Sequence, residues 1–150
     1  MTDVIIRRAT GADVPAIVAL LADDELGSTR ESPDDLAPYE HAFAQIDADR
    51  GEHLVVAERD HQVIGTLQLS LLPGLSRRGA LRAQIEGVRI AGSARGLGLG
   101  ETLVRWAIDE ARSLGCVLVQ LTSDKTRGDA HRFYERLGFT ASHEGFKLPL

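Results

Sequence analysis

The residues best suited to chemistry form a glycine-rich segment, Arg95-Gly96-Leu97-Gly98-Leu99-Gly100. The segment falls between a predicted strand and a predicted amphipathic helix. A loop with so few side chains can direct several backbone N–H groups at an anion, with the positive end of the helix dipole behind them. The pattern therefore predicts a phosphate-binding loop. The alternative is that the glycines only permit a tight turn between strand and helix.

Two common nucleotide-binding patterns do not describe this loop. A dinucleotide fingerprint has the spacing G-x-G-x-x-G, whereas the glycines here alternate at positions 96, 98 and 100. A P-loop continues as Gly-Lys-Ser/Thr, whereas Gly100 is followed by Glu101. A nucleotide-binding protein is disfavoured for this reason. Cys116 is also a weak candidate nucleophile, because no histidine stands near it in the sequence.

The strand before the loop carries an irregular hydrophobic pattern. Leu81, Ala83 and Ile85 are apolar at every second position, but beyond Gly87 the apolar residues are Val88 and Ile90. The alternation shifts by one residue at the glycine, as it does where a β-bulge inserts an extra residue. We predict a bulge near Gly87 that bends a strand spanning 80–90.

The other elements follow from hydrophobic spacing and from capping residues. A Thr10…Asp13 capping box predicts the start of the first helix. Asp60-His61 separates the two strands of a predicted hairpin. In chain order we expect a strand at 4–8, a helix through 14–21, a helix end and loop over 22–31, a helix at about 38–49, strands at 53–59 and 62–72, a loop at 73–79, the bulged strand, a helix at 99–114, a buried strand at 117–119, a helix from 126 to 137, and short strands at 139–141 and 145–148.

Composition restricts the class of protein. The chain has 150 residues, 43% of them hydrophobic and 26% charged, which is typical of a single globular domain spanning 1–150. A net charge of −5 disfavours nucleic-acid binding. We expect no metal site, no membrane segment and a cytoplasmic location, because the sequence lacks Cys/His ligand spacing, long apolar runs and a secretory signal.

Three segments together resemble the GCN5-related N-acetyltransferase (GNAT) family. The Arg-x-x-Gly-x-Gly spacing of Arg95 to Gly100 is similar to the family's coenzyme A pyrophosphate loop. Ile85 to Ile90 resembles its bulged fourth strand, and Asp129 to Phe139 resembles its last helix, with the sequence Phe-Tyr before Leu-Gly-Phe. The resemblance implies an α/β (α+β) fold: a mixed, mostly antiparallel sheet with a parallel, splayed strand pair, flanked by about four helices.

The resemblance also implies an activity and a cofactor site. The expected reaction is direct transfer of an acetyl group from acetyl-CoA to a primary amine in a ternary complex, with no metal. The alternative is a non-catalytic acyl-CoA-binding sensor or regulatory module. The resemblance also leaves a homodimer open. The expected cofactor-binding residues lie in the bulged strand and in the glycine loop: Val88, Ile90, Arg95, Gly96, Leu97, Gly98, Leu99 and Gly100.

Two residues match catalytic positions of that family. Tyr134 matches the tyrosine that protonates the departing thiolate, and the alternative is a packed aromatic. Glu86 matches a carboxylate that assists deprotonation of the amine, often through water, and the alternative is an ion pair with Arg82 or Arg89. One departure concerns Arg127, which stands where many relatives have an asparagine that contacts pantetheine.

The acceptor amine is not identified by the sequence. Glu25 belongs to an acidic group, with Asp23 and Asp24, that would favour a cationic amine at the acceptor site or else sit at a solvated helix end. Arg82 and Gln84 would contact the acceptor or face solvent. His143 is a candidate local base near the acceptor cleft.

Overall fold

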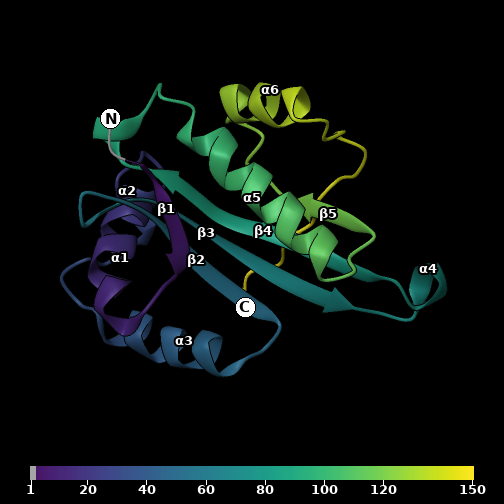
Figure 1. Ribbon diagram of the computed structural model, residues 1–150, viewed down its shortest axis with the longest axis horizontal. Helices are drawn as coiled ribbons and strands as arrows, with labels where there is room; N and C mark the ends of the chain where they lie inside the picture. The colour runs from purple at the N-terminus through teal and green to yellow at the C-terminus, as the bar shows by residue number, and fades with distance from the viewer. Residues whose placement is uncertain (1–2) are drawn as a thin grey trace. The chain divides into compact units, whose positions relative to one another are not determined.

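A computed structural model describes residues 3–150, and it divides the chain into two compact units, Met1–Gln120 and Leu121–Leu150. The first unit contains nearly all of the sheet, whose strand order is β1-β2-β3-β4-β5 (Figure 1). The strands are β1 (Ile5–Arg8), β2 (Glu52–Arg59), β3 (Gln62–Pro73), β4 (Leu81–Ile90) and β5 (Leu118–Leu121). Neighbours from β1 to β4 pair antiparallel, and β4 and β5 are parallel, so the sheet is mixed as expected.

The helices differ in length and in how they pack. Residues 3–150 contain six α-helices, α1 (Val14–Ala22), α2 (Gly27–Arg30), α3 (Ala37–Ala48), α4 (Ser76–Gly79), α5 (Leu99–Ser113) and α6 (Gly128–Arg136), and two 3₁₀ turns, Gly11–Asp13 and Gly92–Ala94. Four are longer than one turn, and the one-turn helices α2 and α4 lie where loops were predicted. None of the helices in residues 3–150 combines the length and the apolar character needed to cross a bilayer.

Alternating side chains of β3 separate the two faces of the sheet. Thr66 lines a cavity beneath α1 and α3. Gly65, one residue earlier, faces α5, because a Cβ there would lie 3.0 Å from Leu103. The α5 face is closely packed, since Leu67, Leu69, Leu103 and other residues there are almost fully buried. By contrast, α3 contributes no buried residue.

A charged cluster fixes the entry to α1. The Asp13 carboxylate accepts hydrogen bonds from Arg7 Nη1 at 2.8 Å and Nη2 at 2.9 Å, and from the Thr10 backbone N–H at 2.7 Å. Arg7 Nε also donates to Glu58 at 2.5 Å. The capping box predicted at Thr10 is confirmed. The hydrogen bonds from Arg7 lower the pKa of Asp13, and the two carboxylates raise the pKa of Arg7.

The predicted bulge in β4 is confirmed. Thr66 pairs with Arg89 and Gln68 with Glu86, so Leu67 on β3 lies opposite two residues, Gly87 and Val88. Gly87 has φ of +63°, a conformation that glycine adopts without strain. Because the bulge adds one residue, Ile85 and Ile90 lie on the same face of the sheet although their numbers differ in parity.

The second unit differs from the prediction beyond its helix. The helix expected at 126–137 is found as α6, and Leu137 and Gly138 end it. The short strands expected at 139–141 and 145–148 are wrong: residues 139–150 contain no strand or helix. The side chains of 141–150 are all exposed, and local alternation without a buried face does not hold a strand.

Candidate active site

The glycine loop presents backbone donors at the start of α5. Gly96 and Gly98 have φ values of +81° and +78°, and a Cβ built on either would meet no atom within 4 Å. The first α5 bond runs from the Thr102 N–H to the Gly98 carbonyl at 3.1 Å. The N–H groups of residues 99–101 therefore have no acceptor inside the helix. An exposed loop with this geometry, at the positive end of a 15-residue helix, is suited to bind an anion.

The end of β4 directs another backbone donor away from β3. The Ala91 N–H donates to the Ile64 carbonyl at 2.8 Å, and Ile90 pairs with Gly65. In an antiparallel ladder, hydrogen-bonded and non-bonded pairs alternate, so the N–H of Ile90 points away from β3. That is the side of β4 on which β5 lies in the strand order. This N–H therefore takes no part in the ladder between β3 and β4.

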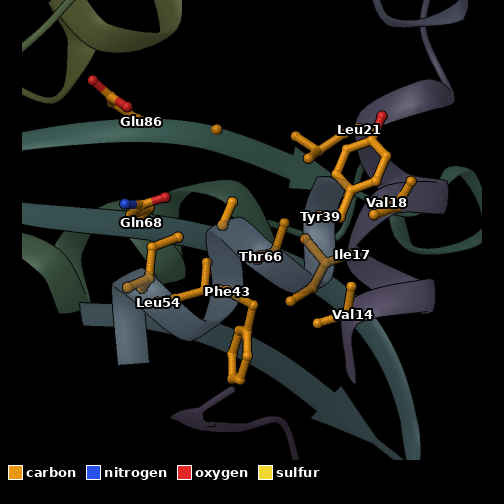
Figure 2. Close-up of a pocket in the computed structure, with 13 residues that line it drawn as sticks. Val14, Ile17, Val18, Leu21, Tyr39, Phe43, Leu54, Thr66, Gln68 and Glu86 are labelled. Atoms are coloured by element: carbon orange, nitrogen blue, oxygen red, sulfur yellow. The ribbon is translucent and has the colours of Figure 1, made fainter. Parts of the chain in front are cut away.

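Glu86 lies on the opposite side of the bulge from Ile90, in a row of side chains that crosses the sheet. Leu54 pairs with Gln68, and Gln68 pairs with Glu86. All three line a cavity of about 200 Å³ between the sheet, α1 and α3 (Figure 2). Glu86 is exposed and accepts a hydrogen bond from Gln84 Nε2 at 2.5 Å. The carboxylate is thus held at the edge of a cavity large enough for a small ligand.

Two aspartates after α1 pair with arginines of β4 and the glycine loop. Asp24 Oδ2 lies 3.2 Å from Arg89 Nε, just beyond the bulge, and Asp23 Oδ2 lies 3.7 Å from Arg95 Nη2 in the glycine loop. Glu25 is exposed in the turn before α2. The acidic group expected at the acceptor site is therefore divided, since two of its members pair with arginines of β4 and the loop.

Arg82 and Gln84 belong to a hydrogen-bonded chain on the cavity face. Arg82 Nη1 donates to Gln120 Oε1 at 3.3 Å, and Gln120 Nε2 donates to Gln84 Oε1 at 2.9 Å. Both side chains are half-buried. On the same face, Gln68 and Ser70 donate to Glu52 Oε2 at 3.0 and 2.6 Å.

The remaining predicted residues lie in the second unit. Tyr134 is half-buried on α6, with its ring centroid 5.1 Å from that of Phe133 and 5.7 Å from that of Phe139. His143 is exposed, and its Nδ1 lies 2.7 Å from Ser142 Oγ. Arg127 directly precedes α6.

Two other kinds of site are disfavoured. Burial raises the pKa of the Cys116 thiol in the first unit, which disfavours a reactive thiolate. Within residues 3–150, no three His, Cys, Asp or Glu side chains are grouped as metal ligands.

Comparison with known proteins places this arrangement in a family. The sequence profile of the acetyltransferase (GNAT) family matches residues 15–139. The chain belongs to this family. It is also 30% identical over 148 residues to an aminoalkylphosphonate N-acetyltransferase of Salmonella typhimurium, covering 97% of this chain and 90% of that protein.

Solved structures share the fold of this acetyltransferase. A protein described as a transcriptional regulator from Bacillus halodurans C-125 has 47% identity and a TM-score of 0.95, covering 99% of this chain and 100% of that one. An acetyltransferase structure from Clostridium acetobutylicum, solved with acetyl-CoA, has 18% identity and a TM-score of 0.76, covering 98% and 96% of the two chains. The family assignment and the mixed sheet confirm the expectations from sequence, and the chain is an enzyme of the N-acetyltransferase class.

Several residues of the candidate site do not follow from the sequence. Gln68 and Tyr39 line the cavity, and Gln120 supports Gln84. One signal was available for Gln68: the alternation that places Leu67 and Leu69 on one face of β3 leaves Thr66, Gln68 and Ser70 on the other. No local signal identified Gln120, because its partners come from a strand 36 residues earlier.

Proposed function

We propose that this chain transfers an acetyl group from acetyl-CoA directly to a primary amine bound in the cavity beside Glu86. The observation that supports the proposal most is the bulge in β4. It separates a carboxylate on the cavity face, at Glu86, from a backbone donor directed away from β3, at Ile90. The glycine loop follows within the next ten residues. One strand thus joins a site for the amine to a site for the thioester.

The loop fits the diphosphate of coenzyme A. The open space next to Gly96 and Gly98 lets a phosphate approach the backbone closely. Arg95 is exposed at the start of this loop and supplies a positive charge next to the donors. Val88 and Ile90 would contact the pantetheine, as the family resemblance implies. The acetyl-CoA in the related Clostridium acetobutylicum structure supports the choice of cofactor.

The proposed chemistry assigns one task to each residue. Glu86 accepts a proton from the bound ammonium group through water, which frees the nitrogen lone pair. The nitrogen attacks the thioester carbonyl carbon, and the Ile90 N–H stabilises the oxyanion. The C–N bond forms, and the C–S bond breaks as the Tyr134 hydroxyl protonates the departing thiolate. The nitrogen of the new amide gives up its remaining extra proton, which returns through water to the Tyr134 oxygen, and Glu86 releases its own proton to solvent. A phenol of pKa about 10 is a suitable donor to a thiolate.

The acceptor class is a primary amine. The Salmonella relative is named for aminoalkylphosphonates, and a Trypanosoma brucei relative, 35% identical over 89 residues, is named for glucosamine 6-phosphate. Both compounds are small primary amines, which supports a small amine as the acceptor here. Both also carry a phosphorus oxyanion, which the lining of this cavity does not match with a cation.

A direct assay tests the proposed reaction. The purified chain is incubated with acetyl-CoA and a panel of primary amines, and free thiol and acetylated product are both quantified. We expect one thiol released per acetylamine formed, and an E86Q variant that binds acetyl-CoA but turns over slowly. Binding of acetyl-CoA without thiol release from any amine would contradict the proposal.

A second candidate function is sensing of acyl-CoA. It is favoured by the description of the 47% identical Bacillus halodurans protein as a transcriptional regulator. A sensor would bind acyl-CoA in the glycine loop and respond by a change in its regulatory state, without transferring the acyl group. The same assay separates the two functions, because the sensor would bind acetyl-CoA tightly and release no thiol.

A further inference from the structure

The cavity between α1, α3 and the sheet has chemically different ends (Figure 2). Most of its wall is aliphatic or aromatic, with Ile17 and Val18 from α1 and Phe43 from α3. Gln68 and Glu86 lie together at one end, where β3 and β4 pass beneath it. A ligand that fills this cavity would therefore contact hydrocarbon over most of its surface and polar groups at one end.

The charge of the lining favours a cation and disfavours an anion. Glu86 is the one charged side chain among the thirteen described residues that line the cavity, and none of the thirteen is lysine, arginine or histidine. An ammonium group at Glu86 would be neutralised. A phosphonate or carboxylate in the cavity would lose its hydration without gaining a cationic partner, which is strongly unfavourable.

The volume sets the size of the apolar group. An apolar cavity of about 150 Å³ can accommodate benzene, and this cavity measures about 200 Å³. We propose that the acceptor is a primary amine on a compact apolar group of about one ring, with its amino group at Glu86 and no anion in the cavity. The proposal builds on the proposed acetyl transfer, but the ligand class has its own binding test.

The surface helix α3 offers a variant that fills the cavity without disturbing the core. Ala42 lines the cavity although its side chain is exposed. Ala44 lies on the same helix and is also exposed, but it does not line the cavity. A42F should therefore occupy the space that the ligand needs, and A44F is the matched control for added surface hydrophobicity.

The test uses two probes that share the group H₂N–CH₂–CH₂–: 2-phenylethylamine, which carries a ring, and 2-aminoethylphosphonate, which carries an anion. Binding to the full chain is measured by calorimetry at neutral pH, and turnover by thiol release from acetyl-CoA. We expect 2-phenylethylamine to bind at least about tenfold more tightly than the phosphonate. A42F should weaken its binding at least about tenfold, and A44F should not.

Each outcome decides between the two proposals. Tighter binding of the phosphonate, or equal binding of the ring amine to wild type and A42F, would overturn the ligand class even if amines are acetylated. Cavity-dependent binding of the ring amine without any acetylation would support the ligand class and contradict the proposed function.

A separate observation concerns the hydrogen-bonded chain from Arg82 to Glu86. An arginine can only donate hydrogen bonds and a carboxylate can only accept them. Because Arg82 donates to Gln120 Oε1, the Gln120 amide must turn its NH₂ group to Gln84, which then turns its own NH₂ group to Glu86. The arginine at one end and the carboxylate at the other therefore determine the orientation of the two glutamine amides between them.

We infer that Gln84 and Gln120 are positioning residues for Glu86. Gln84 Nε2 donates a hydrogen bond to Glu86 Oε1 at 2.5 Å. This bond holds one carboxylate oxygen and leaves the other for the amine or a bridging water. Glu86 is exposed, and an exposed carboxylate without such a support would occupy several rotamers. This inference also rests on the proposed function, because it assigns Glu86 the role of base.

A double-mutant cycle tests the positioning role. Q84L should lower kcat about tenfold or more and leave the affinity for acetyl-CoA unchanged, and Q120L should act in the same direction. In an E86Q background, Q84L should cause no further loss, because the group that it positions is already disabled. An equal loss of kcat in both backgrounds, or no loss in either, would overturn the inference. If E86Q itself keeps full turnover, the proposed base is wrong as well.

Discussion

Replacement of Gly98 by alanine separates anion binding at the glycine loop from simple loop strain. Gly98 has φ of +78° and precedes the first residue of α5. An alanine in this conformation costs about 1 kcal/mol relative to glycine, which corresponds to a Tm lower by about 2–4 °C for a domain of this size. The added methyl group also projects into the open space through which a diphosphate would approach the backbone.

The opposite end of the same helix supplies the control. Gly115 follows α5, has φ of +87°, and also has no atom within 4 Å of a built Cβ. G115A should therefore lower Tm about as much as G98A. A charge-assisted hydrogen bond to a backbone N–H contributes about 1.5–3 kcal/mol, so loss of one in G98A should weaken acetyl-CoA binding about 10- to 100-fold.

Calorimetric titration of both variants with acetyl-CoA, together with thermal melts, measures the two effects independently. We expect equal melting temperatures and unequal affinities. If G98A binds acetyl-CoA as tightly as G115A does, the loop is only a turn, and the assignment of the diphosphate to it is wrong.

Three further predictions concern catalysis and stability. E86Q should lower kcat about 10²-fold or more in a thiol-release assay, without a change in acetyl-CoA affinity, and full activity would remove the carboxylate from the mechanism. Y134F should likewise lower kcat by about 10²-fold while cofactor binding persists, whereas unchanged turnover at saturation would exclude the phenol as the acid. D13N should lower the free energy of unfolding by about 2–3 kcal/mol at pH 7 in urea titrations, because it disrupts the hydrogen bonds from Arg7. Arg7 lowers the pKa of Asp13 in the folded state. The difference in unfolding free energy between wild type and D13N should therefore be complete above the pKa of an unfolded aspartate, about 4, and should shrink as the pH falls through the lowered pKa of the folded state. A free-energy difference that stays constant into acid would contradict the assigned cause.

Local pattern was sufficient to predict most of the first unit. The alternation of β3, the Asp60-His61 turn and the capping box at Thr10 each determine structure within a few residues. The slip in alternation at Gly87 even located the bulge, because a strand with one buried face cannot change parity without an extra residue. The strands predicted at 139–141 and 145–148 were wrong because alternation predicts a strand only where one face is buried. Those segments alternate in sequence, but every side chain in them except the half-buried Phe139 is exposed.

The candidate site was predictable only where its chemistry lies within one segment. The glycine loop follows from adjacent residues, and Glu86 was singled out by the family resemblance of Ile85 to Ile90. The partners of Glu86 do not follow from adjacent residues, because Gln120 joins it through strand pairing and the cavity is formed by helices 40 to 70 residues away in the chain. The ion pairs of Asp23 and Asp24 with Arg95 and Arg89 were missed for the same reason.

The loose attachment of α3 has a consequence for how this enzyme can change. None of its residues is buried, yet Tyr39, Phe43 and Ile46 line the cavity. Substitutions along this helix can reshape the cavity while the closely packed layer between α5 and the sheet stays intact. Selection could thus adjust which compounds fit the cavity at little cost to folding.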